Sequence, residues 1–319
     1  APQEGAFALK TMSDTTHGTL TTIGDGTFVP ARVRDYVDLL KPRVMSLVVF
    51  TGLVGVLIAP AHLHPFTAAL AVLAIALGSG AAGAINMWYE RDLDALMART
   101  RNRPLPAGRV APDDALGLGV LLSIFSVLLM AVATNFVAAA LLTAAILFYV
   151  FVYTIWLKRR TPQNIVIGGA AGAFPPMIGW AAATGDVSAV GLALFLLIFL
   201  WTPPHFWALA LYRSDDYRRA GVPMLPVVAG PRETKRQMLI YTLLLTPVAL
   251  APTLLGAVGW LYGAVALAMS FVFIGHAVAV WRAADDATGH GPARRMFRFS
   301  LLYLAILFAA LPLDRAFVG

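Results

Sequence analysis

Residues 66–88, with the sequence FTAALAVLAIALGSGAAGAINMW, contain no charged side chain. A helix needs roughly 20 such residues to cross a hydrocarbon core of about 30 Å. Eight more stretches are mainly apolar and of similar length, near residues 44–60, 112–133, 135–157, 165–183, 188–211, 238–256, 259–281 and 297–315. The sequence therefore predicts an all-α, polytopic membrane protein with about nine transmembrane helices.

The overall composition supports a membrane protein and limits its chemistry. Of the 319 residues, 59% are hydrophobic and 13% are charged, about half the charged fraction of a soluble domain. The chain has no cysteine, which excludes disulfides, thiolate metal sites and a thiol nucleophile. Any chemistry must therefore use carboxylates, other oxygen groups or imidazole.

The basic residues are arranged as membrane topology requires. All of them except Arg315 fall in alternate connections, namely residues 10–43, 91–109, 158–160, 213–236 and 282–298. Because Lys and Arg concentrate in cytoplasmic loops, this predicts a cytoplasmic N-terminus and a periplasmic C-terminus. The same distribution accounts for the net charge of +7, so the charge does not indicate a nucleic-acid partner.

The polar N-terminal segment has no apolar run that would form a secretory signal. Its acids, Glu4, Asp14 and Asp25, argue against a mitochondrial transit peptide, which favours the bacterial cytoplasmic (inner) membrane. We expect residues 1–42 to form a flexible cytoplasmic tail and residues 43–319 to form a single transmembrane domain. Two predicted cytoplasmic connections, 91–111 and 212–237, are long, and long loops tend to carry function.

The first candidate site lies at the inner end of the second predicted span. Asn86, Glu90 and Asp94 are spaced by four residues, which places them on one face of a continuing helix. Three oxygen ligands can hold Mg²⁺, and the arginines that follow, including Arg99 and Arg103, suit a metal-bound diphosphate. The alternative is a solvated helix end with charges at the membrane surface.

The second candidate site is Tyr153 with Lys158, at the inner end of the fourth predicted span. Lys158 could neutralise a departing diphosphate, and Tyr153 could face a cation through its ring. The alternative is an aromatic belt with a lysine that reaches the membrane surface.

The third candidate site is the run WTPPHFW from Trp201 to Trp207, followed by a second acidic pair at Asp215 and Asp216. Two prolines interrupt the backbone hydrogen bonds of this span, and His205 is an ionisable group within it. Neutral imidazole is a usual axial ligand of heme iron. The alternative is a histidine that bonds a neighbouring helix and only fixes the packing.

Taken together, these motifs resemble those of the intramembrane aromatic prenyltransferases, whose first signature is an Asn followed by carboxylates at i+4 and i+8. Glu90 stands where that family usually has Asp. Arg213 lies where the family has an additional Asp in its second acidic motif. Further stretches are similar to those of the branch that farnesylates heme: residues 99–104, 153–159, 164–180, 201–207 and 216–226.

The resemblance implies nine helices around a central cavity that opens to the cytoplasmic side. It also implies farnesyl diphosphate and heme B as substrates, Mg²⁺ as the cofactor, and heme O for a terminal oxidase as the product, with that oxidase or a heme A synthase as a partner. The implied metal ligands are Asn86, Glu90, Asp94 and Asp216. The implied catalytic residues are Tyr153, Lys158, Arg99 and Arg103, and the implied substrate-binding residues are Asn86, Arg99, Arg103, Lys158, His205, Trp207 and Asp216.

Two other functions have to be compared with this one. The same magnesium site would serve a prenyltransferase for a quinone precursor or a chlorin. His205 is the residue that distinguishes a heme farnesyltransferase from such an enzyme. In a transporter, intramembrane acids would form an ion path and should lie near the middle of the membrane. Here the acids gather at the inner ends of helices, which disfavours a transporter.

Overall fold

The computed structural model describes residues 31–317, and every element within that range is helical. The predicted N-terminal tail over residues 1–42 lies mostly outside the described residues. Its last part forms the short helix α1 (Val33–Leu39).

The membrane-spanning helices lie where the apolar stretches predicted them. Eight long helices of the described part are apolar enough to cross a membrane, and the bent pair of α1 and α2, with an angle of 54° between them, makes a ninth span. This confirms the prediction of about nine. The helices are α2 (Pro42–Leu57), α3 (Pro65–Tyr89), α5 (Pro112–Ala133), α6 (Phe136–Leu147) with its π-helical continuation η1 (Phe148–Leu157), α7 (Asn164–Thr184), α8 (Ala189–Tyr212), α11 (Gly230–Leu254), α12 (Trp260–Arg282) and α13 (His290–Phe317).

Local sequence signals set several of these helix ends. Pro42, Pro65 and Pro112 occupy the first turns of their helices, where the missing N–H costs no helical hydrogen bond. Asn135 caps α6 by accepting a hydrogen bond from the backbone N–H of Ala138 at 2.9 Å. Gly185 ends α7 with a φ of 73°, a conformation that glycine adopts without steric cost.

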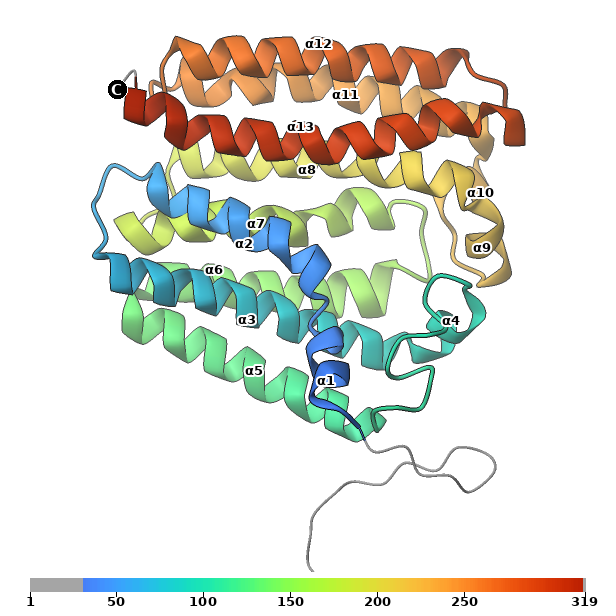
Figure 1. Cartoon of the computed structure of the whole chain (residues 1–319), viewed down its shortest axis with the longest axis horizontal. Helices are drawn as coiled ribbons and strands as arrows, with labels where there is room; N and C mark the ends of the chain where they lie inside the picture. The colour runs from blue at the N-terminus through green and yellow to red at the C-terminus, as the bar shows by residue number, and fades with distance from the viewer. Residues whose placement is uncertain (1–30, 318–319) are drawn as a thin grey trace, which may run out of the picture.

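The helices form two packed groups, which Figure 1 shows as the upper and lower parts of the molecule. One apolar core lies among α8, α11, α12 and α13, and a second lies among α3, α5, α6 and α7. Helix α7 packs against both α2 and α8 and so joins the two groups. A side chain at Gly179 of α7 would collide with the backbone of α2 at Gly52, so a glycine is required at this crossing.

The two long connections come together at one end of the molecule. They form the short helices α4 (Arg91–Leu96), α9 (Ser214–Arg219) and α10 (Leu225–Val228), all at the right of Figure 1, while the C-terminus lies at the opposite end. Leu93 and Met97 from the first connection share an apolar cluster with Tyr217 and Val222 from the second. Both acidic motifs are therefore brought to the same end of the helix bundle.

Candidate active site

The first acidic motif is buried within the protein. Helix α3 ends at Tyr89, and Glu90 links it to α4. Backbone hydrogen bonds from Glu90 to Asn86 and from Asp94 to Glu90 continue the helical pattern across this junction. The exposed fractions of Asn86, Glu90 and Asp94 are 2%, 1% and 1%. Such burial contradicts a solvated helix end, because charged groups are buried only where they are paired or bind a ligand.

Each residue of this motif has a cationic partner. The Nζ of Lys41 donates to Oδ1 of Asn86 at 2.6 Å, and Arg103 forms an ion pair with Asp94 at 2.7 Å. Lys158 forms an ion pair with Oε2 of Glu90. The other carboxylate oxygen of Glu90, Oε1, is buried and has no hydrogen-bond partner among the described residues. A buried acceptor of this kind is costly unless a ligand satisfies it.

Sequence reasoning missed two members of this cluster, Lys41 and Thr154. Thr154 accepts a hydrogen bond from Nδ2 of Asn86 at 3.1 Å. Lys41 immediately precedes α2 and has a φ of 53°, the only positive φ of a non-glycine residue in the described part of the chain. Such backbone strain is concentrated at functional sites. The Lys41-Pro42 pair at the start of a helix was the only available sequence signal for Lys41. The concentration of basic residues in cytoplasmic connections explained the same lysine, so the signal was not specific.

Asp92 lies on α4 beside Asp94, but its side chain is at the protein surface. Its side chain is 61% exposed, and Arg159 binds it with both guanidinium NH groups at 2.7 and 2.9 Å. These hydrogen bonds hold the pKa of the Asp92 carboxyl below its usual value. Asp92 is therefore paired outside the buried cluster and leaves its neighbours to form the site.

Tyr153 and Lys158 are positioned by the π-helical segment η1. The backbone N–H of Lys158 donates to the carbonyl of Tyr153 at 3.0 Å, five residues back, a pattern often found at functional sites. The Lys158 ammonium lies 5.7 Å from the centre of the Tyr153 ring. Gly168 of α7 leaves room for that ring, since a Cβ there would lie 2.1 Å from it. The structure thus brings Tyr153, Lys158 and Glu90 together.

His205 belongs to a separate aromatic group between α8 and α13. Its ring stacks on Trp201 and on Phe297, with centres 4.3 and 4.7 Å apart, and its Nδ1 lies 2.6 Å from Oγ of Ser300. Trp207 is not part of this group. It is 2% exposed and packs edge to face on Tyr241 of α11, 5.5 Å away, so its role in binding a substrate stays a prediction.

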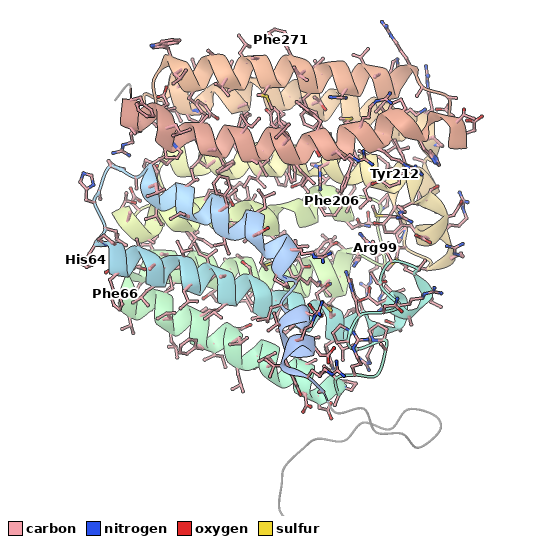
Figure 2. All side chains as sticks on the ribbon, viewed as in Figure 1. His64, Phe66, Arg99, Phe206, Tyr212 and Phe271 are labelled. Carbon is pink, nitrogen blue, oxygen red and sulfur yellow. The ribbon has the colours of Figure 1, made fainter. Side chains whose placement is uncertain are left out.

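Asp216 is 9% exposed and is paired with arginines of its own segment. It binds Arg219 and lies 3.7 Å from Arg213. Within the described residues, no three acidic or histidine side chains gather closely enough to form a ready metal site. Figure 2 shows Arg99 and Tyr212 at this same end of the molecule. The roles of Asp216 and Arg99 also stay predictions.

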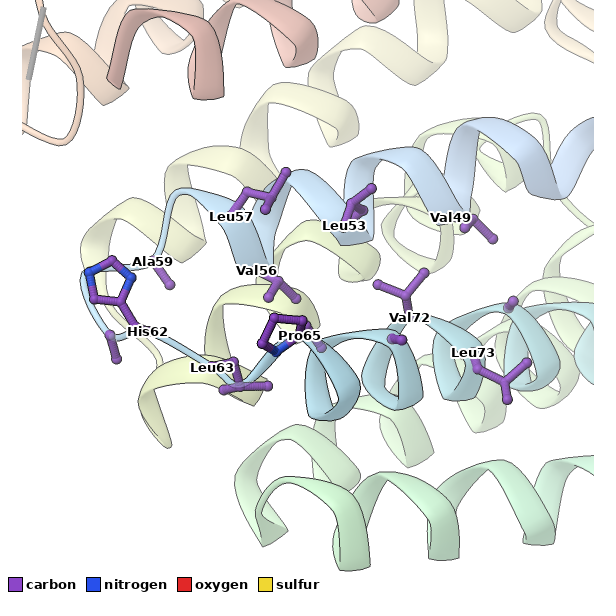
Figure 3. A pocket seen from close by; sticks show the side chains of 14 residues that line it. Val49, Leu53, Val56, Leu57, Ala59, His62, Leu63, Pro65, Val72 and Leu73 are labelled. Carbon is purple, nitrogen blue, oxygen red and sulfur yellow. The ribbon is translucent and has the colours of Figure 1, made fainter. Parts of the chain in front are cut away.

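An apolar groove lies at the other end of α3, between α2 and α3. It has a volume of about 660 Å³ and is lined by residues such as Leu53, Val56, Val72 and Leu73 (Figure 3). Among the described residues that line it, His62 is the only one with an ionisable side chain. Because Asn86 lies near the opposite end of the same helix, the groove is separate from the acidic cluster.

The buried cluster can bind a polyanion together with a divalent cation. Its acceptors are carboxylate and amide oxygens, which Mg²⁺ prefers, and the unsatisfied Oε1 of Glu90 is an acceptor available to a ligand. The ammonium and guanidinium groups that now pair with these acceptors are the groups that bind phosphate oxygens. The aromatic ring of Tyr153 adds a surface that stabilises a cation.

Comparison with known proteins assigns the family. Residues 48–310 match the UbiA prenyltransferase family, and the chain belongs to that family. The curated relatives include protoheme IX farnesyltransferases from Granulibacter bethesdensis, 57% identical over 89% of this chain and 92% of the relative, and from Afipia carboxidovorans, 59% identical over 90% and 91%. A protein of the same name from Parvibaculum lavamentivorans is 58% identical over 88% and 89%.

Solved structures show the same fold at low sequence identity. A digeranylgeranylglyceryl phosphate synthase matches with a TM-score of 0.74 at 18% identity and covers 88% of this chain and 98% of its own. A UbiA homologue from Archaeoglobus fulgidus, bound to DMAPP and Mg²⁺, matches with a TM-score of 0.65 at 18% identity, over 87% of this chain and 99% of its own. These matches confirm the predicted all-helical membrane fold.

Proposed function

We propose that this protein transfers the farnesyl group of farnesyl diphosphate to a vinyl group of heme B and so produces heme O. The observation that carries the proposal is the buried set of Asn86, Glu90 and Asp94, each bonded to a cationic side chain. The curated relatives share more than half of their residues with this chain over nearly its full length, and their name supports heme as the acceptor.

Magnesium fits the donor atoms of the acidic cluster. Asn86, Glu90 and Asp94 would hold it, with Asp216 of the second motif as a further ligand. The orphaned Oε1 of Glu90 supports this assignment, because a buried carboxylate oxygen needs a partner. When bound, the metal neutralises charge on the diphosphate and so makes it a better leaving group.

Lys158, Arg103, Lys41 and Arg99 would receive the diphosphate as the bond between C1 of the farnesyl chain and its oxygen breaks. The first three already lie in the cluster, where they bind the residues that would hold the metal. Positive groups placed where negative charge develops stabilise the transition state without reorganising at the moment of reaction. Lys158, Arg103 and Lys41 would each move from a protein acceptor to a diphosphate oxygen.

Tyr153 would stabilise the allylic cation that develops at C1. Its ring is fixed against Gly168 and lies near the Lys158 ammonium, which favours departure of the diphosphate on the same side. The heme vinyl group supplies the electron pair for the new bond to C1. Water adds to the resulting cation and loses a proton, which leaves a hydroxyl group on the product.

The protein would work in the bacterial cytoplasmic membrane, with α4, α9 and α10 on the cytoplasmic side. The concentration of basic residues in the connections at that end supports this orientation. The central cavity implied by the family resemblance belongs to this proposal, as do a terminal oxidase or a heme A synthase as partners that receive heme O.

The test uses purified full-length protein with heme B, farnesyl diphosphate and Mg²⁺, and mass spectrometry of the heme products. We expect a hydroxyethylfarnesyl heme that requires Mg²⁺ and does not form with Asp94→Ala. Prenylation of an aromatic acid or a chlorin, with heme left unchanged, would keep the metal site but refute heme as the acceptor.

A further inference from the structure

The ring of His205 is fixed on nearly every side by residues of α8 and α13. Trp201 and Phe297 cover its two faces, and Phe206 meets it edge to face at 5.2 Å. Trp201, one turn before His205 on α8, also donates its Nε1–H to the backbone carbonyl of Ser300 at 2.8 Å. Both residues of α8 therefore bind the same residue of α13, which sets the position of one helix against the other.

The hydrogen bonds of Ser300 determine where the His205 proton lies. The Ser300 Oγ is 2.7 Å from the carbonyl oxygen of Phe297 and 2.6 Å from Nδ1 of His205. Two oxygens approach to 2.7 Å only with a proton between them, and the carbonyl has none to give. Since the hydroxyl has a single proton, Ser300 donates it to Phe297 and accepts the Nδ1–H of His205. The lone pair of the neutral ring is then on Nε2.

Nε2 is the free position of this ring. No hydrogen bond to it is formed by any residue of the described part, and Nε2 is not among the side-chain polar atoms that are fully enclosed without a partner. A histidine that binds a metal commonly donates its second ring N–H to a protein acceptor, which fixes its orientation. A histidine that only pinned two helices together would need the Ser300 contact but not a free, oriented Nε2.

A group of arginines lies beside the same aromatic residues. Phe297 packs on Tyr212 with ring centres 6.3 Å apart, and the guanidinium groups of Arg294 and Arg213 lie 5.4 and 6.0 Å from the centre of the Tyr212 ring. Arg294 forms no ion pair with any acid of the described residues. It is therefore a cation available to a negatively charged ligand at the edge of the aromatic group.

We propose that Ser300 holds His205 in its Nδ1–H tautomer so that Nε2 is the axial ligand of heme iron, while Arg294 binds a carboxylate of the same heme. This rests on the proposed function, because heme B is the acceptor substrate there. His205 and Arg294 bind and orient the heme, and Ser300 is a positioning residue that acts through His205. The ligand is an iron tetrapyrrole with acidic side chains.

The experiment titrates ferric heme B into the purified full-length protein, without farnesyl diphosphate, and records the absorption and electron paramagnetic resonance spectra. We expect the spectrum of histidine-ligated iron. His205→Gly should lose it, and added imidazole should restore it by taking the place of the side chain. Ser300→Ala should weaken heme binding about 10-fold, the size of effect typical for the partner of a metal-binding histidine.

Matched variants control for packing. Ser270→Ala removes a buried hydroxyl that bonds Tyr303 between α12 and α13, and His276→Ala removes a histidine that packs on Phe299. Neither should change the heme spectrum. Arg294→Gln should weaken heme binding without altering the ligand signature, while Arg295→Gln, at the exposed neighbouring position, should have no effect.

An unchanged heme spectrum in His205→Gly would overturn the proposal, as would a weakening of heme binding in Ser270→Ala equal to that in Ser300→Ala. Heme O production is measured on the same wild-type preparation. If heme O forms but the spectrum does not depend on His205, the axial ligand is wrong and the function stands. If the ligand signature depends on His205 but no heme O forms, the proposed reaction is wrong and the heme site stands.

Discussion

The acidic cluster at the end of α3 and the aromatic group between α8 and α13 differ in charge: the first is built from ion pairs and the second from neutral rings. In the first, Lys158 and Arg103 pair with the buried carboxylates of Glu90 and Asp94, and Lys41 donates to the amide oxygen of Asn86. In the second, neutral rings surround one histidine whose proton is fixed by Ser300. The two regions match the two proposed substrates: a diphosphate would need positive side chains that can bind its oxygens, whereas an iron tetrapyrrole would need one fixed ligand atom.

The largest effect is expected from Asp94→Asn, which removes a charge from the acidic cluster. Turnover of farnesyl diphosphate should fall about 100-fold or more, because the proposed Mg²⁺ site would lose a carboxylate ligand and the metal would no longer neutralise the leaving diphosphate. Asp92→Asn is the matched control on the same helix and should change turnover by less than about twofold, since its pair is exposed. Equal losses in the two variants would contradict a special role for the buried acid.

Lys158→Met should have the next largest effect. It leaves Glu90 buried without its ion pair and removes a group that would receive the diphosphate, so turnover should fall by about 10- to 100-fold. Arg159→Met, one residue along, removes an exposed group that binds Asp92 and Tyr89 outside the buried cluster. Steady-state assays of the two variants would refute the assignment if Arg159→Met were the more damaging change.

Lys41→Met tests whether the strained residue before α2 belongs to the cluster. We expect the KM for farnesyl diphosphate to rise about 10-fold, with a smaller change in kcat, because Lys41 binds Asn86 and would bind a phosphate oxygen. Arg43→Met removes an exposed charge two residues later and is the control. A KM that stays at the wild-type value would show that Lys41 only supports the local backbone.

Gly168→Ala should displace the Tyr153 ring, since the added carbon would lie 2.1 Å from it. The result expected is a fall in kcat of about 10-fold, as the ring loses its position near the developing cation. Gly172→Ala, on the same helix, meets no atom within 4 Å and should leave kcat unchanged. If Gly168→Ala kept full activity, Tyr153 would not need its present position.

The smallest effect on activity is expected from Trp207→Phe. Because Trp207 packs in the core against Tyr241, its loss should lower the temperature of thermal unfolding more clearly than it lowers turnover. Fluorescence-monitored unfolding and the heme assay on one preparation compare the two effects. A large rise in the KM for heme without a loss of stability would place Trp207 in the substrate site instead.

Much of the fold could be predicted from the sequence, because each membrane span is a local property of about 20 residues. The family match also confirms the membrane prenyltransferase predicted from Asn86, Asp94 and the later motifs. Partners distant in sequence could not be predicted. Lys41 bonds a residue 45 positions away, and Ser300 bonds one 95 positions away. The periodicity of residues along one helix gives no information about contacts between helices that are distant in sequence.

Local features of the backbone also could not be predicted from the sequence. The π-helical segment over residues 148–157 has the same apolar composition as its α-helical neighbours, yet it sets the relation of Tyr153 to Lys158. The interruption of the helix at Glu90 was not predicted either, and backbone hydrogen bonds from Glu90 to Asn86 and from Asp94 to Glu90 continue the helical pattern across it. The resemblance implied that both His205 and Trp207 bind a substrate, but residues two apart point to different sides of a helix, and Trp207 packs on Tyr241 instead.

The most direct test of the account separates the two regions by heme titration of Asp94→Asn and His205→Gly, with product formation measured in parallel. We predict that Asp94→Asn binds heme with the wild-type spectrum but makes no heme O, whereas His205→Gly loses the histidine-ligated spectrum. Loss of heme binding in Asp94→Asn, together with an unchanged spectrum in His205→Gly, would contradict the division of the site into a diphosphate end and a heme end.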